Sequence, residues 1–354
     1  MHARSSVPLA PWTTLRVGGP AARMVQLERE ADVLEAVRDA DARGEPLFVL
    51  GGGSNVLCAD EGFPGLVGRM AIHGIDVRRD GDRIALDVGA GEEWDALVER
   101  AVSEGWRGVE SLSGIPGLVG ATPIQNVGAY GQEVAETIAS VRAFDRDAGT
   151  LVDLPPSACH FGYRASTFKG AAAWSARGNR WIVTRVRFEL ERGDDARVRY
   201  AELARALSVD LGANAPAARV RETVIALRRA KGMILDAADP DSASAGSFFV
   251  NPVVDPATVA RVEQVAGERP PRFDAGEGRV KLAAAWLVEH AGFAKGWGQG
   301  AAGVSRKHAL AIVNRGGATS AELLSAAHAI RDGVRARFGV TLEPEPVMVG
   351  CAWE

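Results

Sequence analysis

Two glycine-rich segments carry the residue types that most clearly suggest ligand chemistry. The first, Leu50–Leu57, follows an apolar run and places three consecutive glycines before Ser54 and Asn55. Glycine has no Cβ and tolerates positive φ, so successive backbone N–H groups can converge on a phosphate oxygen. The segment lacks the G-x-G-x-x-G spacing of a dinucleotide fingerprint and the G-K-[ST] ending of a P-loop. Composition alone therefore fits a phosphate-binding loop and an ordinary tight turn equally well.

The second segment, Ser113–Gly131, alternates small residues with amide and aromatic side chains along its whole length. Such a stretch can bring backbone donors and acceptors, together with the Gln125 and Asn126 amides, close to a flat heterocycle and a diphosphate. The spacing alone does not name the ligand.

The cysteines and histidines do not suggest a metal or redox centre. Cys58, Cys159 and Cys351 are odd in number, far apart and without a C-x-x-C pair, and the six histidines show neither i, i+4 nor H-x-H pairing. We therefore expect reduced thiols and no metal site.

Periodic patterns indicate how these segments are positioned in the first half of the chain. Residues 30–44 predict a helix and 46–50 a short buried strand. Residues 74–91 predict a hairpin turning at Asp80-Gly81. A further helix is expected over 94–102 and an alternating strand over 181–190, which makes the first half a mixed α/β assembly.

The second half looks more helical. Residues 211–218 show neither a clear helical nor a clear strand periodicity, and we expect a domain boundary near residues 203–216. Beyond it, apolar stripes predict helices over 257–265, 280–290 and 320–338. Helical stripes mainly report burial, so we interpret them as core packing.

Size and charge exclude several classes of protein. A chain of 354 residues and 37.3 kDa predicts two or three compact units. Its 47% hydrophobic and 24% charged residues suit a globular enzyme, and a net charge of -4 argues against a nucleic-acid partner. No apolar run approaches the roughly 18 residues that span a bilayer, and the first ten residues lack a signal-peptide core. We expect a cytoplasmic protein with no membrane partner.

Five motifs in order resemble the UDP-N-acetylenolpyruvoylglucosamine reductase (MurB) family, with type I-like features. They occupy residues 14–20 (TLRVGGP), 51–55 (GGGSN), 113–131, 163–169 (YRASTFK) and 245–252 (AGSFFVNP), and the resemblance runs from about residue 12 to 350. It implies an α+β fold with a PCMH-type (VAO-like) FAD-binding domain at 12–203, divided into subdomains of about 12–70 and 71–203. A C-terminal α+β substrate-binding domain is implied at 217–354, with the end of the chain returning toward the flavin site.

The resemblance also implies a reaction. Members reduce UDP-N-acetylglucosamine enolpyruvate to UDP-N-acetylmuramate for peptidoglycan synthesis, using non-covalent FAD and NADPH as hydride donor. Hydride would pass from flavin N5 to the enolpyruvyl C3, and a proton would reach C2. The charge that develops in the adjacent carboxylate requires fixed cations or donors beside it and a proton source at C2. We expect a monomer, and a monovalent-cation requirement is left open.

The family motifs assign three catalytic residues. Ser247 matches the proton-donating serine, and Arg164 would hold the carboxylate through its planar fork. Glu345 matches the second glutamate of an L-E-x-E ending that assists the enol intermediate, with Glu343 as the near rival. The chain departs from the family at Pro346-Val347, where an arginine expected near the flavin is missing.

The same resemblance assigns binding residues. Tyr200 resembles the tyrosine of a flexible loop in type I members, and Lys231, Asn251 and Lys281 would contact the substrate diphosphate and uridine. The residues expected to bind FAD are Leu50, Gly51, Gly52, Gly53, Ser54, Asn55, Val56, Leu57, Ser113, Gly114, Ile115, Pro116, Gly117, Gly120, Ala121, Gln125, Asn126, Gly128, Ala129, Tyr130 and Gly131.

Two alternatives stay open. A PCMH-type FAD oxidase or dehydrogenase would act on a hydroxylated substrate, although no motif for covalent flavin attachment is present. A non-catalytic nucleotide-sugar binding protein would reuse the same pocket, although the joint presence of Arg164, Ser247 and Glu345 argues against it.

Overall fold

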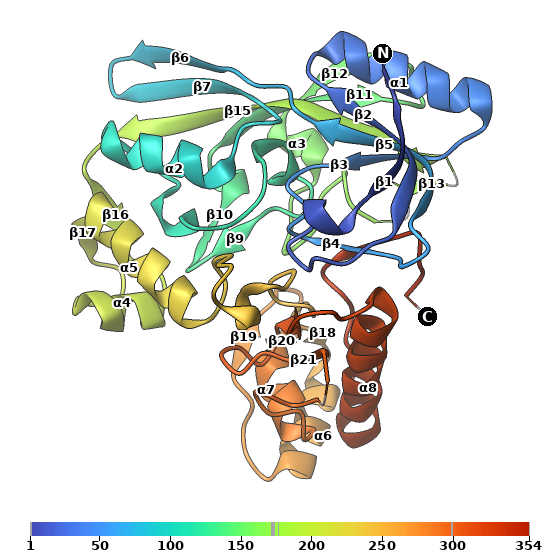
Figure 1. The fold of residues 1–354 in the computed structure, drawn as a ribbon. Helices are drawn as coiled ribbons and strands as arrows, with labels where there is room; N and C mark the ends of the chain where they lie inside the picture. The colour runs from blue at the N-terminus through green and yellow to red at the C-terminus, as the bar shows by residue number, and fades with distance from the viewer. Residues whose placement is uncertain (1, 171–173, 176, 299, 354) are drawn as a thin grey trace. The chain divides into compact units, whose positions relative to one another are not determined.

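The chain forms two compact units, each assembled from separated stretches of sequence. The computed structural model describes residues 2–170, 174–175, 177–298 and 300–353 (Figure 1). Unit 1 contains the residues up to Val7, Ala21–Gly53 and Phe63–Arg229, and unit 2 contains Pro8–Pro20, Ser54–Gly62 and the chain from Ala230 onward.

The first sheet of unit 1 is built around parallel strands. Its order is β1 (Arg4–Pro8), β2 (Pro20–Leu27), β5 (Phe63–Met70), β3 (Leu47–Leu50), β14 (Gly178–Asn179) and β13 (Trp174–Ser175). Strand β5 runs parallel to both β2 and β3. Helix α1 (Glu30–Arg43) buries Val33, Ala36 and Val37 in the same core as Leu47 of β3, so the predicted helix and buried strand are confirmed.

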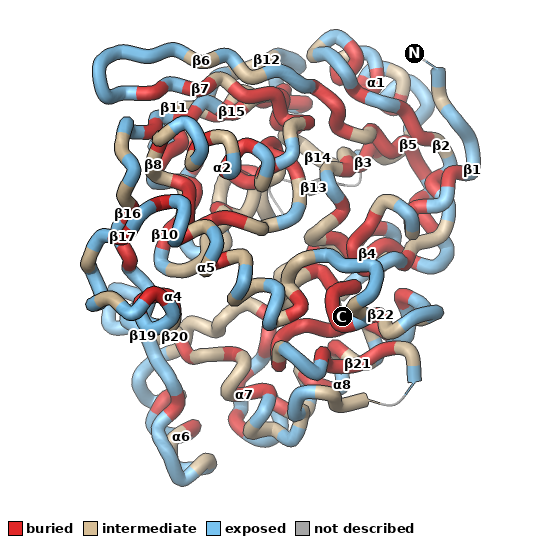
Figure 2. The backbone as a smooth tube through the Cα atoms, turned by 60° about the vertical axis from the view of Figure 1, so that its left-hand side comes forward, coloured by how far each residue is buried: buried red, intermediate tan, exposed pale blue. Residues whose placement is uncertain are grey.

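The second sheet of unit 1 is antiparallel. Its order is β12 (Thr150–Leu154), β11 (Ile138–Asp145), β15 (Trp181–Arg192), β7 (Arg83–Gly89) and β6 (Ile75–Asp80), with β8 (Trp106–Arg107) also pairing with β15. Asp80 pairs with Arg83, so the predicted hairpin forms but its turn residues are Gly81-Asp82, one position later than expected. Gly81 takes φ 57°, which glycine adopts without strain. Figure 2 shows that β6 is largely exposed.

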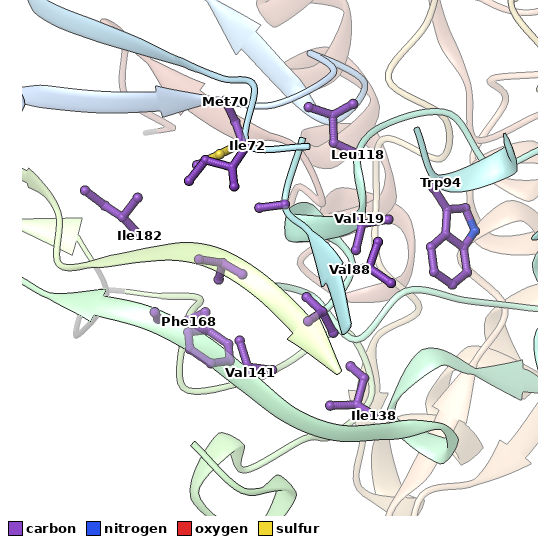
Figure 3. Close-up of a cluster of buried hydrophobic side chains, with 14 of the residues drawn as sticks. Met70, Ile72, Val88, Trp94, Leu118, Val119, Ile138, Val141, Phe168 and Ile182 are labelled. Atoms are coloured by element: carbon purple, nitrogen blue, oxygen red, sulfur yellow. The ribbon is translucent and has the colours of Figure 1, made fainter. Parts of the chain in front are cut away.

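Helix α2 (Trp94–Ser103) packs its apolar face into the large core of unit 1. Trp94 is fully buried, its indole N–H donates to the Leu112 carbonyl at 3.1 Å, and its ring centroid lies 5.9 Å from that of Phe188. Figure 3 shows Val88, Trp94 and Val119 in this cluster. Because Leu118 and Val119 belong to it, the second glycine-rich segment is anchored directly on the hydrophobic core.

Several short elements complete unit 1. They are η2 (Glu110–Leu112), η3 (Val119–Ala121), β9 (Gly128–Ala129), β10 (Gln132–Glu133), η4 (Val134–Glu136), α3 (Pro156–Cys159), β16 (Asp195–Arg197), α4 (Ala201–Leu207), β17 (Asn214–Pro216) and α5 (Ala217–Ala230). The last four share a small core that includes Val198, Leu203 and Val220. The interpreted boundary at 203–216 lies inside this group, and the compact units divide at Arg229. Packing units need not coincide with family domains, so the domain limits stay a prediction.

Unit 2 combines small sheets with three longer helices. Its strands form the orders β18–β20–β19, β21–β22 and β23–β4. The elements are η1 (Ala10–Trp12), β4 (Val56–Cys58), η6 (Pro240–Ser242), β18 (Val253–Val254), α6 (Pro256–Ala266), β19 (Arg272–Asp274), β20 (Val280–Leu282), α7 (Ala284–His290), β21 (Ala302–Val304), β22 (Ile312–Asn314), α8 (Ser320–Phe338) and β23 (Val347–Val349).

Two of the three predicted helices in this half are confirmed, as α6 and α8. Thr319 caps α8 by accepting the Glu322 N–H, and Gly339 ends the helix in the left-handed conformation. The helix predicted over 280–290 is wrong at its start. Residues 280–282 pair with β18 and β19, and α7 begins at Ala284, whose N–H donates to Asn251 Oδ1 at 2.9 Å.

Residues from the beginning of the chain are structural parts of unit 2. Asn314 Nδ2 donates to the Leu15 carbonyl at 2.9 Å, and Thr14 Oγ1 donates to the Ser244 carbonyl at 2.6 Å. Leu15, Val17 and Leu57 are buried in the unit 2 core. The TLRVGGP motif at 14–20 therefore has a packing role. Across the described residues, no helix has the length and apolar content needed to cross a membrane.

Candidate functional site

The two glycine-rich segments meet within unit 1. Gly51–Gly53 directly follow β3, and a Cβ added to Gly52 would lie 2.7 Å from the Cα of Gly117. Real Cβ atoms do not approach a backbone carbon that closely, so the segments cross where side chains are excluded. This crossing brings the polypeptide backbone of both predicted binding loops to one place.

A second close contact holds the Ser113–Gly131 segment on the antiparallel sheet. The Gly120 N–H donates to the Ala90 carbonyl at 3.0 Å, and a Cβ on Gly120 would lie 2.5 Å from the Ala90 Cβ. The Val119 N–H donates to the Glu92 carbonyl at 2.8 Å. The segment is thus held by main-chain contacts on one side and by buried Leu118 and Val119 on the other.

Gly114 is fixed by charged side chains that sequence reasoning missed. Its N–H donates to Asp95 Oδ1 at 2.6 Å, and its carbonyl accepts from Arg228 Nε at 3.1 Å. Arg221 Nη1 donates to the same Asp95 oxygen at 2.6 Å. Burial alone would raise the pKa of Asp95, but the hydrogen bonds from Arg221 and the Gly114 N–H outweigh it and hold the pKa below its ordinary value. Burial lowers the pKa of Arg228.

Asn126 uses its side chain to organise the segment. Its amide nitrogen donates to Glu133 Oε2 at 2.7 Å and to the Gly162 carbonyl at 3.1 Å, and its amide oxygen accepts from the Ala135 N–H at 3.1 Å. Both donors of the amide are therefore used inside unit 1. The Asn126 N–H also donates to the Pro123 carbonyl at 3.4 Å, so this buried residue has a structural role.

Several of these residues adopt unusual backbone conformations. Asn126, Tyr130 and Arg164 have φ of 45°, 49° and 53°, which non-glycine residues rarely adopt. For Tyr130 the cause is local, because Tyr130-Gly131 forms the two-residue turn between β9 and β10, with both φ positive. Positive φ outside glycine costs about 1–3 kcal/mol and persists where other contacts enforce it, often at ligand sites.

The YRASTFK loop packs on the second glycine-rich segment. Arg164 Nη2 donates to the Gly128 carbonyl at 2.9 Å, and Ser166 Oγ donates to the Ile124 carbonyl at 2.5 Å. The guanidinium carbon of Arg164 also lies 5.6 Å from the centroid of the Tyr163 ring. These contacts bring the predicted catalytic arginine next to predicted cofactor-binding residues.

Tyr200 joins the same region through Tyr130. Their ring centroids are 5.7 Å apart in an edge-on arrangement, and Tyr200 keeps 40% of its surface exposed. Burial raises the pKa of Tyr130 to about 12 and also raises that of Tyr200. Both phenols therefore stay protonated at neutral pH and can act as hydrogen-bond donors.

Ser247 and Glu345 are brought together in unit 2. The Phe248 N–H donates to the Leu310 carbonyl, and the Phe248 carbonyl accepts from the Glu345 N–H, each at 2.8 Å. Ser247 itself is partly exposed between buried Ala245 and Phe248. Its hydroxyl makes no hydrogen bond to any residue that the structure describes. Two of the three predicted catalytic residues thus lie on paired segments.

Asn55 fixes the backbone around Glu345. Its amide nitrogen donates to the Glu345 carbonyl at 3.3 Å, and its own carbonyl accepts from the Val347 N–H at 3.0 Å. Strand β4 continues this pairing alongside β23 in parallel register. Pro346, at the position that departs from the family pattern, is buried between these contacts.

Asn251 and Lys281 also lie together in unit 2. Val253 pairs with Lys281, and the Leu282 N–H donates to the Pro252 carbonyl at 2.9 Å. The Asn251 amide oxygen caps α7, while Lys281 Nζ lies 5.7 Å from the Phe273 ring centroid. Lys231 directly follows α5 and is partly exposed.

The described residues contain no cluster of three or more His, Cys, Asp or Glu side chains suited to a metal ion. Cys58, Cys159 and Cys351 are free thiols.

The glycine crossing generates a direct prediction. Gly52→Ala should displace Gly117 and weaken retention of the flavin expected from the sequence by about tenfold or more, as a 1 Å shift of binding groups commonly does. Gly51→Ala is the matched control for packing, because its Cβ would meet Ala121 and Leu118 at an ordinary 3.9 Å. Thermal unfolding and flavin dissociation would be measured on both, and equal stability in the two variants would contradict the crowding argument.

Asp95 should contribute stability with a defined pH dependence. Because its folded pKa is depressed, the contribution is complete above the unfolded pKa of about 3.9 and is lost as pH falls through the folded value. Asp95→Asn should lower the free energy of unfolding by about 1–2 kcal/mol at pH 7, a value reduced for the partial exposure of Asp95.

Urea unfolding of wild type and Asp95→Asn between pH 7 and pH 3.5 would test this, and the difference should shrink below about pH 4. Glu99→Gln is the control, since Glu99 lies 3.8 Å from Arg221 but is 71% exposed. A difference that stays constant to pH 3.5 would refute the assignment.

Comparison with protein-family models gives two matches. Residues 21–155, which contain both glycine-rich segments, match the FAD binding domain. Residues 239–349, which contain Ser247, Asn251, Lys281 and Glu345, match the UDP-N-acetylenolpyruvoylglucosamine reductase C-terminal domain. FAD is therefore the cofactor indicated for the first region, and its glycine-lined backbone fits a ligand of that kind.

Relatives that align over nearly the whole chain carry the same reductase name as the C-terminal family model. The chain is 50% identical to the UDP-N-acetylenolpyruvoylglucosamine reductase of Thermobifida fusca, over 98% of this chain and 97% of the relative. It is 51% identical to that of Streptomyces coelicolor, over 98% and 90%. The crystal structure of UDP-N-acetylenolpyruvylglucosamine reductase (MurB) from Thermus caldophilus aligns with a TM-score of 0.67 at 27% identity, over 98% of this chain and all of the other. The chain therefore belongs to the UDP-N-acetylenolpyruvoylglucosamine reductase family.

Proposed function

We propose that the chain reduces UDP-N-acetylglucosamine enolpyruvate to UDP-N-acetylmuramate with NADPH as hydride donor, in peptidoglycan precursor synthesis. The observation that carries this is the 50% identity to a reductase of that name across 98% of the chain.

The glycine-rich segments of unit 1 are the proposed FAD site. The close approach of Gly52 to Gly117 supports it, because it brings the main chain of both expected binding loops to one place, and glycine backbone can approach a phosphate closely. Bound FAD would supply hydride transfer from NADPH to the enolpyruvyl C3. Asp95, Arg221 and Arg228 would keep Gly114 in place during binding.

Ser247 is the proposed proton donor to C2. The hydroxyl is partly exposed and makes no hydrogen bond within the described part of the chain, so it can turn toward a substrate. An ordinary serine is a weak acid, and its alkoxide needs nearby positive charge or donors together with a proton resupply. Glu345 is the proposed partner, because its backbone N–H donates a hydrogen bond to the carbonyl of Phe248, the residue after Ser247.

Arg164 is proposed to hold the substrate carboxylate as charge develops there. Its permanent charge and planar fork suit a carboxylate, and the hydrogen bond to the Gly128 carbonyl orients it. Tyr200, Lys231, Asn251 and Lys281 are proposed to bind the nucleotide diphosphate. The protonated phenol of Tyr200 and the two ammonium groups can donate to phosphate oxygens.

Further properties belong to the same proposal. The domains are placed at 12–203 and 217–354, and the protein acts as a cytoplasmic monomer. A monovalent cation is an optional addition.

The function is tested by absorbance. We expect a yellow protein whose bound flavin is bleached by NADPH and restored by the enolpyruvyl UDP-sugar, with one NADPH oxidised per substrate reduced. A preparation whose flavin does not respond to NADPH, or which oxidises alcohols with oxygen, would overturn the proposal.

Ser247→Ala should leave flavin absorbance and flavin reduction by NADPH unchanged. It should slow substrate reduction by about 10²- to 10⁴-fold, the range for loss of a general acid. Ser325→Ala, on the exposed face of α8, is the control and should behave as wild type. Unchanged turnover in Ser247→Ala would remove its role as proton donor.

A further inference from the structure

Trp353 lies against the two aromatic residues that follow Ser247. Its ring centroid is 6.2 Å from that of Phe248 and 6.1 Å from that of Phe249. The two phenylalanines form a T-shaped pair at 5.2 Å and are 1% and 2% exposed. One partly buried indole therefore closes over a buried aromatic pair.

Side chains of α8 also lie against the indole. The His328 ring centroid lies 4.6 Å from it, and the guanidinium carbon of Arg331 lies 5.0 Å from it. Trp353 is thus fixed between a long capped helix and the segment that carries Ser247. Aromatic pairs at these separations and cation–π contacts are both favourable.

The packing of Trp353 matters because few other contacts constrain Ser247. Its hydroxyl makes no hydrogen bond among the described residues, and Gly246 before it has φ 75°, where the backbone turns without a side chain to pack. The residues after it are fixed by the Leu310 and Glu345 backbone and by the aromatic contacts. The backbone position of Ser247 is therefore set from its C-terminal side.

We infer that Trp353 is a positioning residue for proton transfer, acting through Phe248 and Phe249 on Ser247. The inference rests on the proposed function, in which Ser247 delivers the proton to C2. Trp353 touches neither serine nor substrate in this role. It restricts the Phe248–Phe249 pair, so that the Ser247 backbone is held where its hydroxyl can reach C2 of the substrate.

Rapid-mixing measurements on the flavin-loaded enzyme follow flavin reduction and flavin reoxidation separately. In Trp353→Ala, flavin reduction by NADPH should stay within about twofold of wild type, while reoxidation by the enolpyruvyl UDP-sugar should slow by about tenfold or more, because small displacements of a reacting group are costly. The solvent deuterium isotope effect on reoxidation should rise, since proton transfer becomes more limiting. Trp353→Phe should recover most of the rate by restoring an aromatic contact.

Trp297→Ala is the matched control. Trp297 packs against the same core and pairs with Phe293 at 4.8 Å, and among the described residues its ring makes no ring contact with Phe248 or Phe249. Its two half-reactions should match wild type. Adding Trp353→Ala to Ser247→Ala should cause little further slowing, because the residue to be positioned is already absent.

The outcomes are distinguishable. Reoxidation at the wild-type rate in folded Trp353→Ala, or equal slowing of both half-reactions, overturns the inference while leaving the function intact. Wild-type reoxidation in Ser247→Ala removes the proposed proton donor, and the inference with it. If Trp353→Ala does not fold, Trp353→Leu replaces it under the same criteria.

Discussion

The close approach of Gly52 to Gly117 is the constraint on which the cofactor region depends. It links the end of β3 in the parallel sheet to a segment that Gly120 and Ala90 tie to the end of β7 in the antiparallel sheet. Both sheets of unit 1 are thereby connected through main chain at one place. Any side chain at the crossing would separate the loops and cover the amides that a diphosphate needs.

The first glycine-rich loop serves both compact units. Its glycines belong to unit 1, whereas Ser54–Leu57 belong to unit 2, where Asn55 and β4 pair with the backbone around Glu345. One short loop thus contributes glycines to the crossing with Gly117 and hydrogen bonds to the backbone around Glu345. A change in this loop is therefore expected to affect both units.

Many polar residues of the family motifs satisfy the protein's own backbone. Asn126 joins its segment to Glu133, Ala135 and Gly162, Asn251 caps α7, and Asn55 holds the Glu345 backbone. Buried backbone groups need partners, and short amide side chains provide both a donor and an acceptor. Ser247 differs from them, because its hydroxyl has no such internal task among the described residues.

The sequence by itself determined the long periodic elements and the family. Helices α1, α6 and α8 and strands β3 and β15 follow from local patterns, because burial of one face imposes a period on the residues. The five motifs indicated the family, and through it the FAD binding domain and the reductase C-terminal domain that the family models match. Only the tertiary structure decided the start of α7, the Asp95–Arg221–Arg228 support of Gly114, and the packing of Trp353 on Phe248 and Phe249. Their partners lie far apart in the chain, so no local pattern records contacts that arise only when the backbone has folded.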